Sequence, residues 1–480
     1  MKIVMLNPPF MDRYSKSSRS PAVTKSGTIY FPLWLSYATG VLDKAGHEIK
    51  LIDAPAKSMK NEETLEMINS FAPSFVVIDT STPSINSDLA FAKSIKAILP
   101  TVRICLVGTH ATACVDEILP NNPHIDFIAR HEYDYTLPEL ADAIEGKVKL
   151  LDVKGISYLE NGTIAHNADR EYIQDLDELP FVAEVYKKYL DIKDYFYAHV
   201  SYPTVSIFSS RGCPSKCFYC MYSQVMFGKA YRKRSAKNLY DECVYITKNF
   251  PEVKEILIDD DNFAVDQKNV KEFCQLMIDN KVKLKWVVQC RVTLEYKTMV
   301  LMKKAGCRLV VVGYESGSQK VLDGMHKGIT LEMSLKFNDA AKKAHMRVHG
   351  CFMVGNPGET KETMMETLEF SKKLRMDTVQ YFPLIVYPGT EAWAWAKEHD
   401  YIKAKNYDEW LTPDGMHNCV LSTPEVSNQE LVDFCNYARK RFYLRPSYCF
   451  MKLGECLTSK DDFVRTFKAF GTFKKYLLKK

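Results

Sequence analysis

The sequence predicts an α/β protein in three parts: a doubly wound parallel sheet, a partial (βα)6 barrel and a mostly helical carboxyl-terminal extension. Short apolar runs alternate with helix-like stretches over residues 1–146, and the alternation returns over residues 204–387. A chain of 480 residues has room for about three domains. Its 46% hydrophobic and 26% charged residues are typical of a folded globular protein.

The first part, residues 1–146, contains five strand-like runs. We expect strands at 2–6, 49–52, 75–78, 104–107 and 126–128, and helices at 32–42, 89–99 and 137–144. Such alternation gives a parallel sheet with helices on both faces, in a Rossmann-like or flavodoxin-like arrangement. Ligands of these sheets lie beyond the carboxyl ends of the strands, so we expect the functional loops there.

Residues 147–203 are interpreted as a linker, in which Asn161-Gly162 between two apolar runs predicts a hairpin turn. Six further strand-like runs follow, at 204–208, 255–258, 286–289, 309–312, 348–354 and 379–382. Successive βα units without an obvious reversal favour a full or partial barrel. The active site of such a barrel lies at the carboxyl ends of its strands.

The carboxyl-terminal part, residues 388–480, is expected to be mostly helical and to end in a basic amphipathic segment at 463–480. Its lysines suit a peripheral contact with a membrane surface or an acidic substrate, and a helix packed on the barrel is the alternative. Because no 18-residue apolar run and no secretory signal pattern occur, we expect a cytoplasmic protein. The net charge of +5 gives no case for nucleic acid as a partner.

Three closely spaced cysteines follow the first barrel strand. Cys213, Cys217 and Cys220 have the spacing C-x3-C-x2-C, so one loop can surround a single metal centre. Thiolates are the ligands of iron–sulfur clusters. A four-iron cluster held by three cysteines leaves one iron free to bind a small molecule. A structural zinc site is the alternative, but no nearby C-x2-C or H-x3-H pair supplies its fourth ligand.

This triplet resembles the signature of the radical SAM superfamily, in which an aromatic residue, here Tyr219, precedes the last cysteine. The resemblance covers about residues 204–387 and implies that the three cysteines hold a 4Fe–4S cluster. It also implies reductive cleavage of S-adenosylmethionine at that cluster. The resulting 5′-deoxyadenosyl radical abstracts hydrogen from an unactivated carbon, while the protein supplies orientation and a dry pocket.

The same resemblance assigns contacts with S-adenosylmethionine to residues that follow successive barrel strands. Acidic residues replace the usual Gly-Gly-Glu near the methionyl amino group, and an arginine after the third strand suits the carboxylate. A glutamate after the fourth strand suits the ribose hydroxyls, and backbone after the fifth meets adenine. These residues are Tyr219, Asp259, Asp260, Arg291, Glu315, Gly355 and Pro357.

The amino-terminal part is similar to the cobalamin-binding domain that precedes many radical SAM domains. It lacks G-x-G-x-x-G after its first strand, which disfavours a dinucleotide. It departs from the cobalamin pattern at Thr109 and His131, where glycines are usual. D-x-H-x-x-G is also absent, so we expect no histidine from that motif on cobalt. A cofactor-free module is the alternative. The expected cobalamin contacts are Asn7, Pro8, Ser81, Thr82, Gly108, Thr109, His110, Arg130 and Glu132.

These features together predict a cobalamin-dependent radical SAM enzyme that resembles the class B methyltransferases, in which the substrate receives a methyl group from methylcobalamin. The resemblance implies a small-molecule or lipid substrate and an external one-electron reductant such as flavodoxin or ferredoxin. Residues 130–136 and 439–446 resemble the branch of anaerobic cyclases and hopanoid-modifying enzymes. Radical cyclisation or rearrangement of a lipid or tetrapyrrole is therefore the alternative. An iron–sulfur electron-transfer protein would leave the loops after the barrel strands unexplained.

Overall fold

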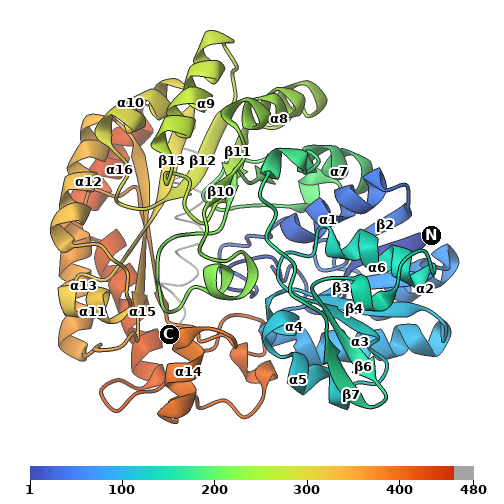
Figure 1. The fold of residues 1–480 in the computed structure, drawn as a ribbon. Coiled ribbons are helices and arrows are strands. Elements are labelled where there is room, and N and C mark those ends of the chain that lie inside the picture. Colours follow the sequence, from blue (N-terminus) through green and yellow to red (C-terminus); the bar gives the residue numbers. More distant parts are fainter. Residues whose placement is uncertain (459–480) are drawn as a thin grey trace.

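The computed structural model describes residues 1–458 and contains a mostly parallel seven-stranded sheet and a parallel six-stranded sheet, which lie side by side. Figure 1 shows the amino-terminal sheet with its helices, in blue to cyan, next to the green-to-orange barrel. A segment around α14 (Glu391–Glu398) runs below both sheets, close to α4 (Thr109–Ala113). The two predicted α/β units are therefore present, and they are in contact.

The amino-terminal sheet has the strand order β2-β1-β3-β4-β5-β6-β7, and its first five strands are parallel. The order 2-1-3-4-5 is that of flavodoxin-like sheets, which confirms the predicted fold class. The five strands are β1 (Lys2–Asn7), β2 (Glu48–Asp53), β3 (Phe75–Asp79), β4 (Arg103–Val107) and β5 (Phe127–Ala129). The helices of this unit are α1 (Leu33–Lys44), α2 (Asn61–Phe71), α3 (Ile85–Ile98), α4, α5 (Val115–Ile118) and α6 (Thr136–Ile144).

The predicted hairpin forms within residues 147–203, and it extends the amino-terminal sheet. Strand β6 (Ile156–Glu160) pairs antiparallel with β5 and with β7 (Thr163–His166). The turn residues Asn161 and Gly162 have φ angles of 50° and 81°. Positive φ at both central positions is what a tight hairpin turn requires. Helix α7 (Val182–Tyr189) then packs against α1 before the chain enters the barrel.

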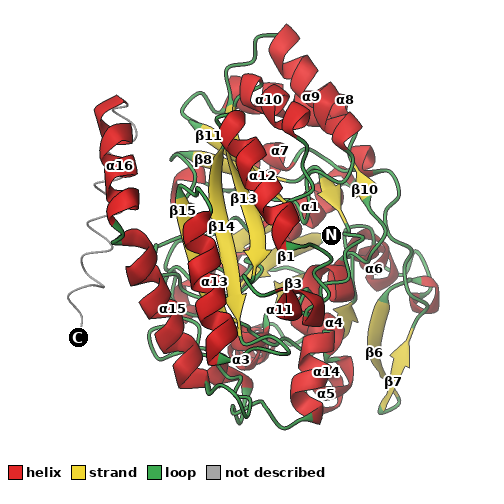
Figure 2. Ribbon diagram, turned by 90° about the vertical axis from the view of Figure 1, so that its left-hand side faces the viewer, coloured by secondary structure: helices red, strands yellow, loops and turns green. Residues whose placement is uncertain are grey.

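Six parallel strands form an open barrel in the order β15-β14-β13-β12-β11-β8, which confirms the predicted (βα)6 architecture. The barrel strands are β8 (Thr204–Ile207), β11 (Glu255–Ile258), β12 (Lys285–Cys290), β13 (Cys307–Glu315), β14 (Arg347–Val354) and β15 (Thr378–Pro383). Figure 2 shows α12 and α13 against the outer face of β13 and β14. The barrel helices are α8 (Ala236–Asn249), α9 (Gln267–Asp279), α10 (Tyr296–Lys304), α11 (Gln319–Gly324), α12 (Leu331–Lys343) and α13 (Lys361–Lys373).

The carboxyl-terminal part is helical, as predicted. Helix α15 (Asn428–Tyr443) begins with a capping box, in which the Ser427 hydroxyl accepts from the backbone of Glu430 and the Glu430 carboxylate accepts from Ser427. It packs against β15, the last barrel strand, and is followed by α16 (Pro446–Thr458). No helix within residues 1–458 is long and apolar enough to span a bilayer. The basic segment at 463–480 lies outside the described residues.

The carboxyl ends of the two parallel sheets face each other, and residues 8–31 pass between them. This loop leaves β1 and is anchored to both units. The Lys16 ammonium donates to Asp88 at 2.7 Å on the amino-terminal side. The Arg19 guanidinium pairs with Asp259, directly after β11 of the barrel. Both edges at which α/β proteins bind ligands are thereby brought to one interface.

Candidate functional site

The three predicted cluster cysteines lie on one loop at the mouth of the barrel. The loop leaves a short strand, β9 (Ser210–Arg211), which pairs with β10 (Arg232–Lys233). Gly212 starts the loop with a φ of 78°, and a Cβ there would stand 2.2 Å from the Ala230 carbonyl oxygen. Glycine is therefore required at this position. The loop ends in a π-helical turn at Tyr222–Met226, a feature frequent at functional sites.

The donor chemistry of this loop suits an iron–sulfur cluster. Cys213 and Cys217 are both 7% exposed, and neither they nor Cys220 form a disulfide. Burial raises the pKa of the Cys220 thiol to about 11, so binding of a metal cation is needed to keep it as a thiolate near neutral pH. Within residues 1–458, no three His, Cys, Asp or Glu side chains stand close enough for a single metal ion.

A buried network beside the loop centres on Glu315, the last residue of β13. Its Oε1 accepts hydrogen bonds from the Lys327 ammonium at 2.7 Å and from the Tyr219 hydroxyl at 3.0 Å. Its Oε2 is buried without a partner. A buried carboxylate oxygen without a donor is costly. Glu315 therefore offers an acceptor to a ligand, which fits the ribose contact that the sequence predicts.

Arg291 connects this network to the cysteine loop. One guanidinium nitrogen donates to the Cys217 sulfur at 3.5 Å, and another donates to the Lys327 backbone carbonyl. The side chain remains half-buried, with further N–H groups for an anion such as the methionyl carboxylate. Sequence reasoning missed Lys327, because it lies in the loop after α11 and belongs to no motif that we recognised.

Two of the acidic residues that follow β11 have different roles. Asp260 is completely buried, and its two oxygens accept from the backbone N–H groups and hydroxyls of Ser209 and Ser210. A carboxylate has about four lone-pair sites, so Asp260 is fully occupied in holding the end of β8. Asp259 instead accepts from Gln289 at 2.5 Å and from Arg19. Sequence reasoning missed Arg19, which comes from the other unit.

The loop after β14 contains the predicted adenine contacts. Gly355 has a φ of 95° and donates its backbone N–H to Glu359 at 3.2 Å. Pro357 lies beside α11, where its carbonyl oxygen stands 2.7 Å from the Cβ that Gly324 lacks. Between them, the Asn356 side-chain oxygen is buried without a partner, a second free acceptor at the carboxyl edge of the barrel.

Most of the predicted cobalamin residues gather at the carboxyl edge of the amino-terminal sheet. Ser81 contacts the Tyr14 hydroxyl at 2.8 Å, and Thr82 contacts the His110 ring at 3.0 Å. Burial lowers the pKa of His110 to about 3, so its ring is neutral. The Asn7 amide donates to Asp53 at 2.7 Å and leaves its own oxygen buried without a partner.

The remaining predicted cobalamin residues are placed by the backbone at the same edge. Pro8 follows Asn7 directly and is buried, and Thr109 opens α4 half-buried. Gly108 precedes it with a φ of 105°, and a Cβ there would stand 2.5 Å from the Thr80 carbonyl oxygen. The buried Asn7 oxygen without a partner, next to the half-buried Thr109, fits a polar ligand at this edge.

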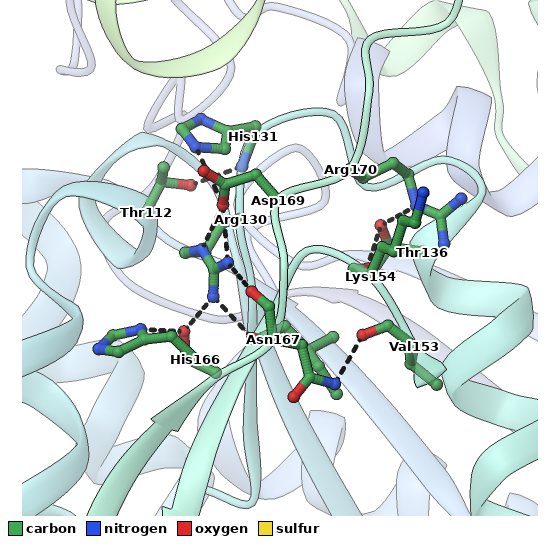
Figure 3. Close-up of polar contacts among 12 residues, drawn as sticks. Thr112, Arg130, His131, Thr136, Val153, Lys154, His166, Asn167, Asp169 and Arg170 are labelled. Atoms are coloured by element: carbon green, nitrogen blue, oxygen red, sulfur yellow. Dashed lines mark hydrogen bonds and ion pairs between the residues drawn. The ribbon is translucent and has the colours of Figure 1, made fainter. Parts of the chain in front are cut away.

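Arg130 and Glu132, also predicted for cobalamin, have their charged groups engaged within the protein. Arg130 donates to the Ile156 and Asn167 carbonyls and to Asp169, and so holds the β6–β7 hairpin (Figure 3). Glu132 accepts from Arg232 of the barrel unit at 2.8 Å. The structure therefore gives these two residues roles in joining segments of the chain.

The fold and the site define an α/β protein in which a three-cysteine loop at a barrel mouth faces the ligand edge of a flavodoxin-like sheet. Comparison with known families agrees. The model of the Radical SAM superfamily matches residues 207–371, and that of the B12 binding domain matches residues 19–141. Together the two matches cover more than half of the chain. The chain belongs to the radical SAM superfamily, has an amino-terminal B12-binding domain and is a cobalamin-dependent radical SAM enzyme.

Relatives extend over most of the chain. A protein described as an uncharacterized methyltransferase of Pyrococcus horikoshii is 29% identical over 93% of each chain. The anaerobic magnesium-protoporphyrin IX monomethyl ester cyclase of Cereibacter sphaeroides is 27% identical over 86% of this chain and 67% of its own. The solved structure of the methyltransferase TsrM from Kitasatospora setae has a TM-score of 0.65 at 15% identity, over 84% of this chain and 76% of its own. That likeness shows a shared fold.

Proposed function

We propose that this enzyme transfers a methyl group from S-adenosylmethionine to an unactivated carbon of a small-molecule or lipid substrate. The observation that carries the proposal is the meeting of two ligand edges, with the cysteine loop of the barrel facing the polar loops of the amino-terminal sheet. A substrate held between these edges has access to both cofactors. When bound, the cluster supplies the electron that cleaves the sulfonium, and cobalamin carries the methyl group.

On the barrel side, Cys213, Cys217 and Cys220 would hold the cluster. Arg291 would orient the methionyl carboxylate with guanidinium N–H groups that its present contacts leave unused. The free Oε2 of Glu315 would accept a ribose hydroxyl, while Lys327 keeps the carboxylate in place. These contacts bring the reacting atoms together and replace water around them.

On the amino-terminal side, the loops that contain Asn7, Ser81, Thr82, Gly108 and Thr109 would receive cobalamin. His110 is enclosed by Thr82 and by the Tyr407 ring, whose centroid lies 4.7 Å away. We assign His110 to hydrogen bonding within the protein, because its ring is neutral, bonds to Thr82 and makes an edge contact with Tyr407. An external one-electron reductant such as flavodoxin or ferredoxin would complete the system.

The proposal is tested by anaerobic reconstitution with iron, sulfide and hydroxocobalamin. The enzyme is then incubated with a reductant, candidate tetrapyrrole and lipid acceptors, and S-adenosylmethionine labelled in its methyl group. Mass spectrometry should find the label in one acceptor, together with 5′-deoxyadenosine. Release of 5′-deoxyadenosine with no labelled acceptor in any class would reject methyl transfer.

A second function, radical cyclisation or rearrangement with the same cofactors, is favoured by the similarity to the anaerobic cyclase over 86% of this chain. The same incubation separates the two functions. Cyclisation would change the mass of an acceptor by loss of hydrogen and would leave the methyl label in S-adenosylmethionine or its fragments.

A further inference from the structure

Arg211 joins the two cofactor loops through a fully buried ion pair. Its side chain is 1% exposed and lies two residues before Cys213. Its guanidinium donates to both oxygens of Asp134, at 2.7 and 3.1 Å. Asp134 belongs to the loop after β5, on the side where the amino-terminal sheet binds its ligand. This parallel two-bond geometry is the most directional that arginine forms with a carboxylate.

The surroundings of Arg211 fix its position further. Four aromatic rings lie around the guanidinium, with centroids 4.7 to 5.6 Å from its central carbon. Two come from the amino-terminal unit and two from the barrel unit: Trp34, Tyr37, Phe208 and Phe227. The two bonds to Asp134 offset the burial of this charge, although the Arg211 Nε has no partner, so removal of either residue would leave the other charge buried and unpaired.

The same amino-terminal loop also holds the other end of the cysteine loop. The His131 ring contacts the Val225 carbonyl, in the π-helical turn after Cys220, at 2.7 Å. Glu132 accepts from Arg232 at 2.8 Å, and Arg232 lies on the strand that pairs with Arg211. Residues 131–134 therefore contact the chain on both sides of the three cysteines, before Cys213 and after Cys220.

We propose that Arg211 is a positioning residue that couples cluster assembly to cobalamin binding, an inference that rests on the proposed function. Ligation of a cluster fixes the cysteine loop, since metal binding orders the segment that supplies its ligands. Because Asp134 and His131 are attached to that loop at both ends, residues 131–134 become ordered with it. Cobalamin then binds a loop that has already lost its conformational entropy, so cobalamin binds more tightly. By thermodynamic linkage, bound cobalamin favours cluster assembly to the same extent.

The test compares hydroxocobalamin affinity for full-length protein with and without its reconstituted cluster, by equilibrium dialysis. Wild-type protein should bind hydroxocobalamin at least about fivefold more tightly when the cluster is present. Asp134→Asn keeps the shape of the side chain but removes its charge, and Arg211→Lys keeps the charge but removes the two-bond geometry. In both variants the affinity ratio should fall toward one.

Arg234→Lys is the matched control. Arg234 is also buried and also pairs with a carboxylate, Glu242 at 2.5 Å, but both residues lie within the barrel unit. A merely structural loss would lower the melting temperature of this variant as well, without changing the affinity ratio. If Asp134→Asn and Arg211→Lys do not fold, His131→Ala removes the partly exposed contact with Val225 and should also lower the ratio.

Three results would overturn the coupling: an affinity ratio of one in wild-type protein, an unchanged ratio in the folded variants, or an equal fall in Arg234→Lys. Failure of the proposed function has a different signature, since wild-type protein would then bind no hydroxocobalamin in either state or would assemble no cluster.

Discussion

Lys327 and Glu315 form a buried ion pair at the end of β13, with the ammonium 2.7 Å from one carboxylate oxygen while the other oxygen has no partner. Both side chains are 7% exposed. Glu315 itself has a φ of 63°, a left-handed conformation that non-glycine residues adopt infrequently. A strained, half-satisfied acid held by a lysine is an arrangement suited to accepting a donor from a ligand.

Lys327→Met should weaken S-adenosylmethionine binding by about 10- to 100-fold, because it leaves the Glu315 charge buried without its cation. Lys327→Arg should retain part of the affinity. The measurement is the dissociation constant of S-adenosylmethionine for cluster-loaded protein. Lys320→Met is the control, since Lys320 lies exposed on the neighbouring α11 and should bind like wild type. Equal affinity of Lys327→Met and wild type would remove Lys327 from the site.

Cys217→Ala should abolish assembly of an intact cluster and the release of 5′-deoxyadenosine, because the loop then supplies only two thiolates. Iron content and the electron paramagnetic resonance spectrum of the reduced protein measure the first effect. Cys243→Ala is the control, since Cys243 is a fully buried core thiol on α8. It should cost some stability and retain iron. Normal iron content in Cys217→Ala would contradict the assignment.

The free energy of unfolding should fall as the pH rises from about 4.5 to about 7, because of the titration of Glu359. Burial raises the pKa of this carboxyl from 4.5 to about 7. The unfolded chain releases the proton first as pH rises, so the folded state loses up to about 3 kcal/mol across this window. Glu359→Gln should flatten the change in melting temperature, whereas exposed Glu366→Gln should not. A pH profile unchanged by Glu359→Gln would place the effect on other groups.

The strands and the cysteine triplet could be predicted from sequence, because both signals are local. Short continuous apolar runs mark strands that are buried on both faces, and three cysteines within eight residues need no tertiary information. Lys327 and Arg19 could not be found in this way. Each reaches the site from a loop without a motif, and the loop of Arg19 belongs to the amino-terminal unit. Their roles arise only when distant segments meet.

Asp260, Arg130 and Glu132 show a second limit of prediction from sequence. Each lies in a loop whose position in the chain resembles that of a ligand-binding loop, and the charged group of each bonds to other groups of the protein. A sequence pattern locates a loop after a strand but does not tell which side chains point outward. Only the hydrogen-bond partners separate the acids that hold a loop from those that offer a free oxygen.

Asp260 gives a direct test of that distinction. Asp260→Asn can keep its amide oxygen on the N–H groups of Ser209 and Ser210, but its NH2 group then faces two hydroxyls that must change from donors to acceptors. We therefore expect a loss of about 1 to 3 kcal/mol in stability. Asp260 is buried, and this burial raises the pKa of its carboxyl to about 6, so the substitution changes a buried group and not a surface charge. Asp259→Asn should be milder in stability, because Asp259 keeps a carbonyl oxygen to accept from Gln289 and Arg19. Thermal unfolding of the two variants measures the difference, and an equal loss in both would show that the bonds to Ser209 and Ser210 do not set the stability of this loop.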